Sequence, residues 1–248
     1  WLEVVVKRNG KIHRQQFSRG AATGDLEIIG DTDQTGTIIS FRPDPEIFDT
    51  LEFSFETLVS RLRELAFLNR GLKIELIDER TEEVKSKTFQ YEGGIISFVE
   101  YLNRNKDPLH RKVIYVERQM DEIQVEIAMQ YNDGYNENVF SFANDINTVE
   151  GGTHLSGFRT ALTRSLNDYA RKNNLLKENE NNLSGDDVRE GLVAIISVKL
   201  PNPQFEGQTK EKLGNSEVRG IVDSAFYEGL NTYLEENPQV GKSVIGKA

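Results

Sequence analysis

The sequence predicts an α+β fold in two units, residues 1–90 and 91–248. Three observations support this prediction. Leu2, Val4 and Val6 recur at every second position, as apolar residues of a strand do. The apolar residues of 55–68 fall on one face of a helix. Gly93-Gly94 then separates this first set of patterns from a second set, in which strands and helices are again mixed.

The first unit is expected to begin with a β-hairpin. Asn9-Gly10 lies between two extended runs, and this dipeptide favours a type I′ turn, whose two central residues have positive φ. The run Thr35–Phe41 predicts another strand, which Pro43 and Pro45 terminate. The remaining expected elements are a helix and two strands, at Phe55–Leu68, Leu72–Asp78 and Val84–Gln90.

The second unit is expected to alternate helices with strands. Thr153 is the expected N-cap of its long helix, because a threonine hydroxyl can accept a free backbone N–H. The apolar, β-branched run Leu192–Leu200 predicts a buried central strand. Three consecutive strands before the long helix are expected to pair in antiparallel fashion. The expected elements are Ile95–Asn103 (helix), Lys112–Gln119, Glu122–Tyr131 and Asn138–Ala143 (strands), 153 to about 173 (helix), 192–200 (strand) and Ser216–Glu236 (helix).

The composition excludes several classes of function. The 248 residues carry 40 acidic and 30 basic side chains, a net charge of −10, which argues against a dedicated DNA-binding domain. The absence of cysteine excludes disulfides and thiolate metal sites. The longest apolar run, Gly191–Val198, is too short to span a bilayer, so a cytoplasmic protein is expected. A strand pattern that starts at once at Trp1 suggests a piece of a longer chain.

Familiar catalytic patterns are missing. The three histidines lie in separate segments, and His154, at a helix start, is expected to be structural. Asp186-Asp187 could bind Mg²⁺, but an acidic helix start facing the positive end of the dipole is the favoured interpretation. No Walker A run is present; Gly241-Lys242-Ser243 lacks the leading glycine at the required distance.

Two basic residues remain as candidates for function. Lys210 stands in the run Gln208-Thr209-Lys210, a turn after the buried strand, where a mobile ammonium could reach a terminal phosphate. On the long helix, Arg164 and Arg171 lie opposite the apolar stripe and read as a solvated face. Arg159 lies nearer the edge of that stripe, where packing could hold it in place.

Five strings, in order and in register, resemble the ATPase region of the DNA gyrase B family. The similarity extends over essentially the whole chain. The strings are Tyr91–Gly94 (YEGG), Phe98–Asn103 (FVEYLN), Gly151–Arg159 (GGTHLSGFR), Gly185–Leu192 (GDDVREGL) and Gln208–Lys210 (QTK). The resemblance implies that residues 1–90 are the rear strands and helix of a Bergerat-type ATPase sandwich, as in Hsp90, MutL and histidine kinases. It implies that residues 91–248 are an α+β transducer domain with a left-handed crossover.

The same resemblance implies roles for individual residues. Lys210 would contact the γ-phosphate of ATP, assisted by Gln208. Thr37 and Ile39 would line the adenine end of the pocket, and Arg8 would lie at its mouth, where coumarin-type inhibitors bind in this family. Arg159 would face the cavity through which the transported DNA passes. The family's catalytic glutamate and Mg²⁺-binding asparagine precede the matched region, so no metal ligand is assigned and this chain alone is not expected to hydrolyse ATP.

The implied activity is that of an ATP-hydrolysing DNA topoisomerase, an isomerase that uses ATP and Mg²⁺. The implied partners are the gyrase A subunit, double-stranded DNA and a second gyrase B chain, with no membrane. Three alternatives stay open at this point. They are the equivalent subunit of topoisomerase IV, a MutL-like mismatch-repair clamp, and a non-catalytic two-domain module that binds partners through its acidic surface.

Overall fold

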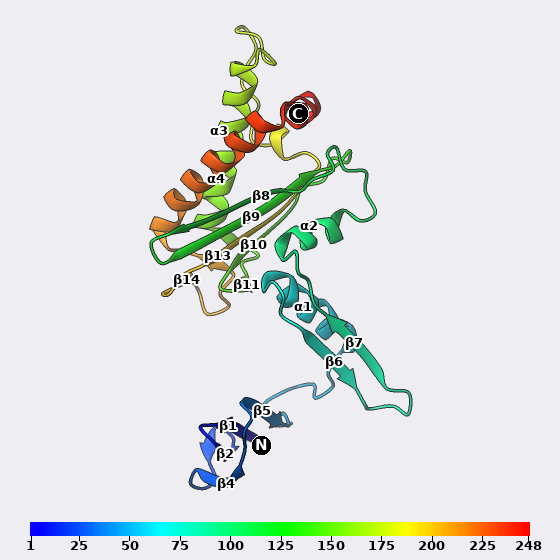
Figure 1. Ribbon diagram of the computed structural model, residues 1–248, viewed down its shortest axis with the longest axis vertical. Helices are drawn as coiled ribbons and strands as arrows, with labels where there is room; N and C mark the ends of the chain where they lie inside the picture. The colour runs from blue at the N-terminus through cyan, green and yellow to red at the C-terminus, as the bar shows by residue number, and fades with distance from the viewer. The chain divides into compact units, whose positions relative to one another are not determined.

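The chain folds into two compact units: unit 1, Trp1–Phe55, and unit 2, Glu56–Ala248. The computed structural model describes all residues from 1 to 248 (Figure 1). The division therefore falls at the first residue of the helix at residues 55–68, whereas the sequence pattern predicts a boundary near residue 90. None of the helices combines the length and the apolar character needed to cross a membrane.

Unit 1 is an antiparallel sheet in the order β3-β2-β1-β5, with β4 also paired to β2. The expected hairpin is confirmed, because Asn9 (φ 53°) and Gly10 (φ 78°) both have positive φ between β1 and β2. Its strands are β1 (Leu2–Arg8), β2 (Lys11–Ser18), β3 (Ala21–Ala22), β4 (Glu27–Asp31) and β5 (Gly36–Phe41). The short strands β3 and β4 were not expected from the sequence.

No side chain of unit 1 is buried, although the sheet carries many apolar residues. Neighbouring positions on β5 point to opposite faces of a sheet. Ile38 and Ile39 are nevertheless exposed by 53% and 59%, so apolar side chains are exposed on both faces of the sheet. The apolar residues of β1 are only half-buried, so this unit taken by itself lacks the fully buried core that stabilises most sheets.

Unit 2 is built around a mixed sheet in the order β11-β10-β13-β9-β8 (Figure 1). The unit also contains two smaller sheets, β6-β7 and β12-β15-β14. Its helices are α1 (Phe55–Leu68), α2 (Ile95–Asn103), α3 (Thr153–Lys172), η1 (Asp187–Arg189, a 3₁₀ turn), α4 (Ser216–Glu236) and α5 (Pro238–Lys247). Its strands are β6 (Ile74–Asp78), β7 (Lys85–Phe89), β8 (Ile114–Met120), β9 (Ile123–Tyr131), β10 (Asn138–Ala143), β11 (Ile146–Asn147), β12 (Gly151–Gly152), β13 (Leu192–Lys199), β14 (Phe205–Glu206) and β15 (Lys212–Leu213).

The expectation of three consecutive antiparallel strands is wrong for β10. β8 and β9 pair antiparallel, but β13 lies between β9 and β10. β10 and β13 run parallel, with Asn138 opposite Val193, so α3 forms the crossover between them. A crossover of this length is what a parallel pair requires. The strand in the middle is the apolar run predicted to be central and buried.

Alternate residues of β13 enter two different apolar clusters. Ala194, Ile196 and Val198 pack with residues of α3 and α4 on one face of the sheet. Val193 and Ile195 pack with residues of α2 on the other face. Figure 1 shows the same layering, with α3 and α4 on one side and α2 on the opposite side. Burial on both faces explains why this strand is apolar throughout.

Aromatic stacking joins α1 to the rest of unit 2. The ring of Phe67 lies 3.7 Å from that of Tyr91 and 4.7 Å from that of Phe98, measured between centroids. Phe67 and Leu68 are buried in the cluster that includes α2. These contacts account for the division at the start of α1, because the helix shares its core with residues from Tyr91 onward.

Two expectations about helix ends need correction. The N-cap of α3 is Gly152 rather than Thr153, which is the first helical residue and whose buried hydroxyl has no hydrogen-bond partner. The helix α5 was not expected at all. It begins at Pro238, a residue suited to a first helical turn, and it buries Val244 and Ile245 against the main core.

Candidate functional site

The Gln208-Thr209-Lys210 run forms the tip of a small hairpin between β14 and β15 in unit 2. Gln208 and Lys210 are exposed, and the Lys210 ammonium makes no ion pair or hydrogen bond. Lys210 also has φ 59°, a left-handed conformation that is uncommon for residues other than glycine. Uncommon backbone conformations of this kind concentrate at functional sites. A cation that is exposed and unpaired is available to an anionic ligand.

The hairpin that carries Lys210 is fixed at its base by β12, the strand that precedes α3. Gly151 and Gly152 pair in parallel with Lys212 and Leu213 of β15. The backbones approach so closely at Gly152 that a Cβ there would lie 2.3 Å from the Leu213 carbonyl oxygen. A second bond reinforces the junction, since the Glu150 N–H donates to the Glu211 carbonyl at 3.0 Å. The start of α3 thereby positions the base of the Lys210 turn.

Buried polar side chains tie this junction to the central sheet. His154, on the first turn of α3, is fully buried and its Nε2 lies 3.0 Å from Thr148 Oγ1. Thr148 Oγ1 also donates to the Ser141 carbonyl on β10 at 2.8 Å. Burial lowers the pKa of His154 to about 4, so its ring is neutral at pH 7. The structural role expected for His154 fits this packing.

The residues predicted to contact adenine and the pocket mouth lie on one face of the sheet in unit 1. Thr37 pairs with Val6, and Ile39 pairs with Val4. Arg8 lies two residues beyond Val6 on β1, so its side chain points to the same face. Thr37, Ile39 and Arg8 are all exposed, and Arg8 has no side-chain partner.

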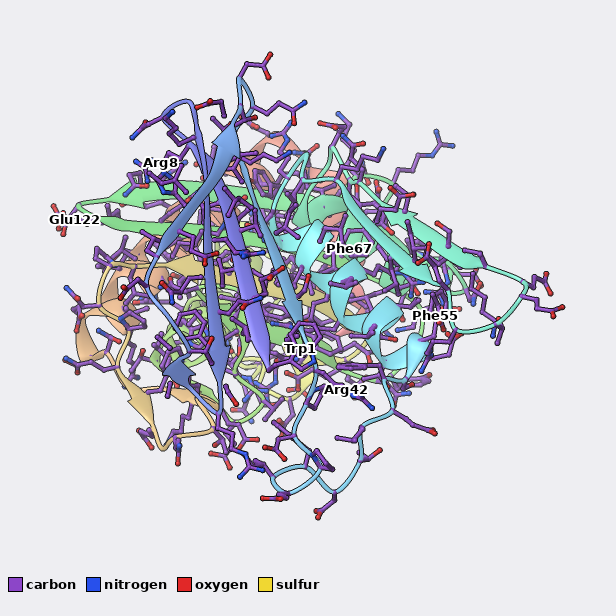
Figure 2. All side chains as sticks on the ribbon, turned by 90° about the horizontal axis from the view of Figure 1, so that it is seen from below. Trp1, Arg8, Arg42, Phe55, Phe67 and Glu122 are labelled. Atoms are coloured by element: carbon purple, nitrogen blue, oxygen red, sulfur yellow. The ribbon has the colours of Figure 1, made fainter.

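An apolar hollow of about 550 Å³ opens at the other end of this sheet. It is lined by Trp1, Phe17, Phe41 and Phe48 among others. Figure 2 shows Trp1 and Arg8 at opposite ends of β1, with Arg42 beside Trp1, to whose carbonyl the Arg42 N–H donates at 3.0 Å. Thr37, Ile39 and Arg8 do not line the hollow. Leu2 and Phe41 do line it, and strand alternation places both on the same face of the sheet as those three residues.

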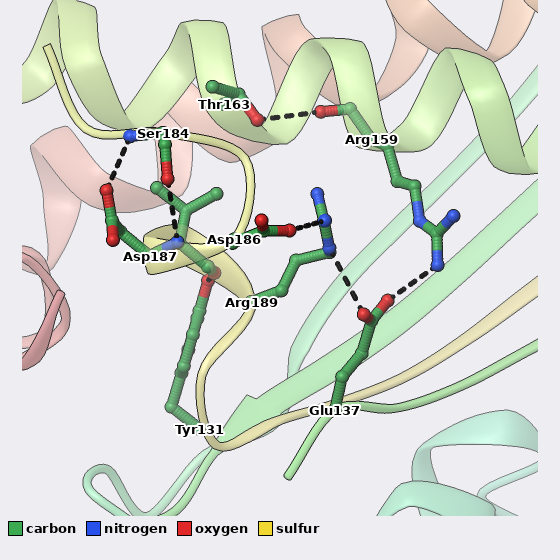
Figure 3. Close-up of polar contacts among 9 residues, drawn as sticks. Tyr131, Glu137, Arg159, Thr163, Ser184, Asp186, Asp187 and Arg189 are labelled. Atoms are coloured by element: carbon green, nitrogen blue, oxygen red, sulfur yellow. Dashed lines mark hydrogen bonds and ion pairs between the residues drawn. The ribbon is translucent and has the colours of Figure 1, made fainter. Parts of the chain in front are cut away.

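Arg159, on α3, belongs to a chain of ion pairs (Figure 3). Its Nη2 lies 2.8 Å from Oε1 of Glu137, in the segment just before β10. The second oxygen of Glu137 accepts a hydrogen bond from Arg189 Nε at 3.1 Å. Arg189 in turn pairs with Asp186, with 2.6 Å between Nη2 and Oδ1. Arg159 is exposed, so the carboxylate that it shares with Arg189 holds it in place, and not the packing expected from its position near the apolar stripe.

Asp186 and Asp187 form an acidic helix start. Ser184 Oγ accepts the Asp187 N–H at 3.2 Å, and Asp187 Oδ2 accepts the Ser184 N–H at 2.7 Å. Hydrogen bonding to Ser184, first through its side chain and then through its backbone N–H, lowers the pKa of the Asp187 carboxyl. No group of three or more histidine and carboxylate side chains in this chain is arranged to hold a metal ion. The two aspartates are thus occupied by the turn itself and by Arg189.

Arg164 and Arg171 are not the simple solvated face that the helical angles predicted. Arg164 pairs with Asp223 of α4 at 3.2 Å and lies over the ring of Tyr227. Arg171 donates to backbone carbonyls of the loop that follows α3, including that of Glu180. Both arginines connect α3 to other segments, a role that angles on a single helix cannot reveal.

Sequence reasoning missed Glu137 and the spatial role of Gly152. Glu137 stands in a polar stretch with no periodicity, and only the pairing of β10 with β13 brings it close to α3 and η1. In the sequence, Gly151-Gly152 stands out only as the start of the GGTHLSGFR string. Two successive glycines also signal a close backbone approach, and that signal could have indicated the contact with β15.

Comparison with known proteins finds similarity to DNA gyrase B along almost the whole chain. The family described as DNA gyrase B matches residues 94–248. The DNA gyrase B protein of Clostridium acetobutylicum is 63% identical over 247 residues, which is 99% of this chain and 38% of that protein. The chain spans about two fifths of the length of the first curated relatives it matches.

Two solved structures share the α+β fold. The 43K ATPase domain of Thermus thermophilus gyrase B, solved in complex with an aminocoumarin, is 43% identical with a TM-score of 0.83. That match covers 100% of this chain and 67% of the Thermus chain. The topoisomerase IV ATP-binding domain of Francisella tularensis, in complex with a small-molecule inhibitor, is 29% identical with a TM-score of 0.85. It covers 99% of this chain and 67% of that chain.

Proposed function

Because this chain belongs to the DNA gyrase B family, we propose that it is part of the ATP-operated clamp of a bacterial type II DNA topoisomerase. In the complete subunit it would couple ATP binding and hydrolysis to strand passage and negative supercoiling. The single observation that carries the proposal is the Lys210 turn. Its ammonium is exposed and unpaired, while its base is fixed to β12 and α3. An unpaired ammonium on a hairpin with a fixed base is suited to sensing a terminal phosphate.

The domain assignment follows the family pattern. We propose that residues 1–90 are the rear part of a Bergerat-type ATP-binding domain and that 91–248 are the transducer, with a left-handed crossover through α3. The exposed apolar faces of the unit 1 sheet support the first assignment, since a sandwich of that type covers its sheet with further layers. The parallel β10–β13 pair joined by α3 supports the second.

Lys210 acts by differential binding. It contacts the γ-phosphate of ATP, assisted by Gln208, and this contact exists only while the terminal phosphate is present. Loss of the phosphate removes the contact and frees the Lys210 side chain, so the orientation of the transducer follows the state of the nucleotide. A charge placed against the transferring phosphate also stabilises the transition state, by on the order of 10²–10³ in rate by analogy with other such donors.

Three residues of unit 1 are assigned to the rest of the nucleotide site. Thr37 and Ile39 would line the adenine end, and Arg8 would lie at the mouth of the pocket. Their shared face of the sheet supports this assignment. The resemblance to the family assigns the Mg²⁺ ligands and the catalytic glutamate to other parts of the complete subunit. The chain alone is therefore proposed not to hydrolyse ATP.

Gyrase is favoured over topoisomerase IV as the parent enzyme. The family model that matches this chain is that of DNA gyrase B, and the gyrase B relatives of Clostridium acetobutylicum and Streptococcus pneumoniae are 63% and 60% identical to it. The proposed partners are accordingly the gyrase A subunit, double-stranded DNA and a second gyrase B chain, all in the cytoplasm. Arg159 is proposed to face the passing DNA.

The proposal is tested by Lys210→Ala in the complete subunit, measured as ATP turnover and as supercoiling with the gyrase A subunit. We expect turnover to fall by on the order of 10²–10³. Lys212→Ala is the matched control, because Lys212 is two residues away but is already paired with Glu206 at 2.9 Å. Near-normal turnover for Lys210→Ala would remove Lys210 from the mechanism. An equal loss for Lys212→Ala would show that the hairpin, and not the Lys210 charge, is responsible.

A further inference from the structure

Two arginines of unit 2 share one carboxylate at the surface formed by α3, η1 and the segment before β10 (Figure 3). We refer to Arg159, Arg189, Glu137 and Asp186 as the arginine cluster. Its formal charge is zero, because two guanidinium groups face two carboxylates. Arg159 uses only Nη2 in its bond to Glu137, so its Nε and Nη1 have no partner. The cluster thus retains donors for a further anion.

We propose that Glu137 is a removable counter-ion that restrains this arginine pair until the phosphates of double-stranded DNA displace it. The inference rests on the proposed function for the location of DNA, but the role of Glu137 comes from the ion pairs themselves. One carboxylate bridges both arginines, at 2.8 Å to Arg159 and 3.1 Å to Arg189. A phosphate that binds both guanidinium groups must therefore compete with Glu137.

Exposure indicates which ion pair can open. The Arg159 side chain is 44% exposed, and Glu137 is 30% exposed. Exposed pairs of this kind are weak in water, so a ligand with more oxygen acceptors can exchange with the carboxylate. Arg189 is only 18% exposed and is also held by Asp186, so it stays in place as the anchor. Arg159 is then the residue that can move.

The chemistry of the donors favours a phosphate diester. A guanidinium is planar and binds phosphate oxygens through two parallel N–H bonds. Such contacts with the DNA backbone carry no sequence information, which suits a protein that must accept any duplex. The net charge of −10 adds a general repulsion, so binding depends on this local patch. Because Glu137 competes for the same guanidinium groups, the arginine cluster binds DNA weakly and reversibly. A duplex that has to pass through the protein requires such binding.

The test is the affinity of the 248-residue chain for a fluorescently labelled DNA duplex of mixed sequence, measured by anisotropy at low salt. Glu137→Gln keeps the shape of the side chain and removes its charge. We expect it to tighten binding about two- to fivefold, in line with the energy of an exposed ion pair. The gain should shrink as salt is raised, since screening weakens both interactions.

Matched variants separate the local effect from a general change in charge. Glu122→Gln makes the same charge change on an exposed, unpaired residue in the β8–β9 turn, at the other end of β9 from the arginine cluster, and should leave affinity unchanged. In the background Arg159→Ala, the gain from Glu137→Gln should disappear. Asp186→Asn provides a second test that does not threaten the fold, because Asp186 is 95% exposed, and it should tighten binding in the same direction.

Three results would overturn the inference. They are unchanged or weaker binding by both Glu137→Gln and Asp186→Asn, an equal gain from Glu122→Gln, and no detectable duplex binding by the wild type and Glu137→Gln. Each leaves the proposed function standing if Lys210→Ala still abolishes ATP turnover in the complete subunit. Failure of the Lys210 experiment with a normal Glu137 response would instead reject the nucleotide role and retain the arginine cluster.

Discussion

Gly152→Ala should disable the Lys210 turn without touching Lys210 itself. The added Cβ would lie 2.3 Å from the Leu213 carbonyl oxygen and 2.6 Å from the Leu213 nitrogen, both of them backbone atoms. Ordinary contact begins at 3.4 Å, so β15 must move by 1.1 Å or more. Gly152 also has φ 134°, which side-chain-bearing residues rarely adopt. Because β15 begins two residues after Lys210, most of this displacement reaches the turn.

A misplacement of about 1 Å can cost on the order of 10² in rate when a charge must meet a reacting group. We therefore expect ATP turnover in the complete subunit to fall about 10²-fold, with a loss of about 1–3 kcal/mol in the free energy of unfolding from overpacking. Turnover is measured under saturating ATP, and unfolding by urea titration of the same protein.

Gly214→Ala is the control for Gly152→Ala. Gly214 directly follows β15, has no positive φ, and its Cβ would meet the Gln204 carbonyl at 3.4 Å, an ordinary contact distance. We expect near-normal turnover and stability for this variant. Normal turnover by a folded Gly152→Ala protein would refute the conclusion that β12 positions Lys210.

Two further predictions concern stability. Gly157→Ala on α3 would place a Cβ 2.4 Å from the Arg219 carbonyl of α4, so we expect a loss of about 1–3 kcal/mol in urea unfolding. Gly220→Ala on α4, with open space around it, should be neutral or stabilising by up to about 1 kcal/mol, and equal effects would contradict the close packing. Because burial lowers the pKa of His154 to about 4 in the folded state, the unfolded chain binds an extra proton between pH 6.5 and 4. Stability should therefore fall as pH decreases through this range, by up to about 3 kcal/mol from His154, and His110, whose pKa is also lowered, adds in the same direction. Urea unfolding at pH 7 and pH 4.5 measures the loss, and an unchanged difference in His154→Gln would exclude His154 as a source.

Elements defined by local patterns were predicted with their bounds. The helices at Phe55–Leu68, Ile95–Asn103 and Ser216–Glu236 agree with the structure, as does the Asn9-Gly10 hairpin. In each case the information lies within a few turns of chain: an apolar face at helical spacing, or two residues that accept positive φ. The local sequence likewise predicts that the Gln208–Lys210 run forms an exposed turn.

What required the tertiary structure is pairing between distant segments. The pattern of Asn138–Ala143 predicts a strand but cannot name its partner, and the sheet places it beside β13 rather than β9. Strands of two residues such as Gly151–Gly152 have no period to detect and exist only because β15 lies alongside. The helix at Pro238–Lys247 depends on burying Val244 and Ile245 in a core built by other elements. Glu137 meets Arg159 and Arg189 for the same reason, because opposite charges 22 and 52 residues apart become partners only when the folded chain brings them within a few ångströms.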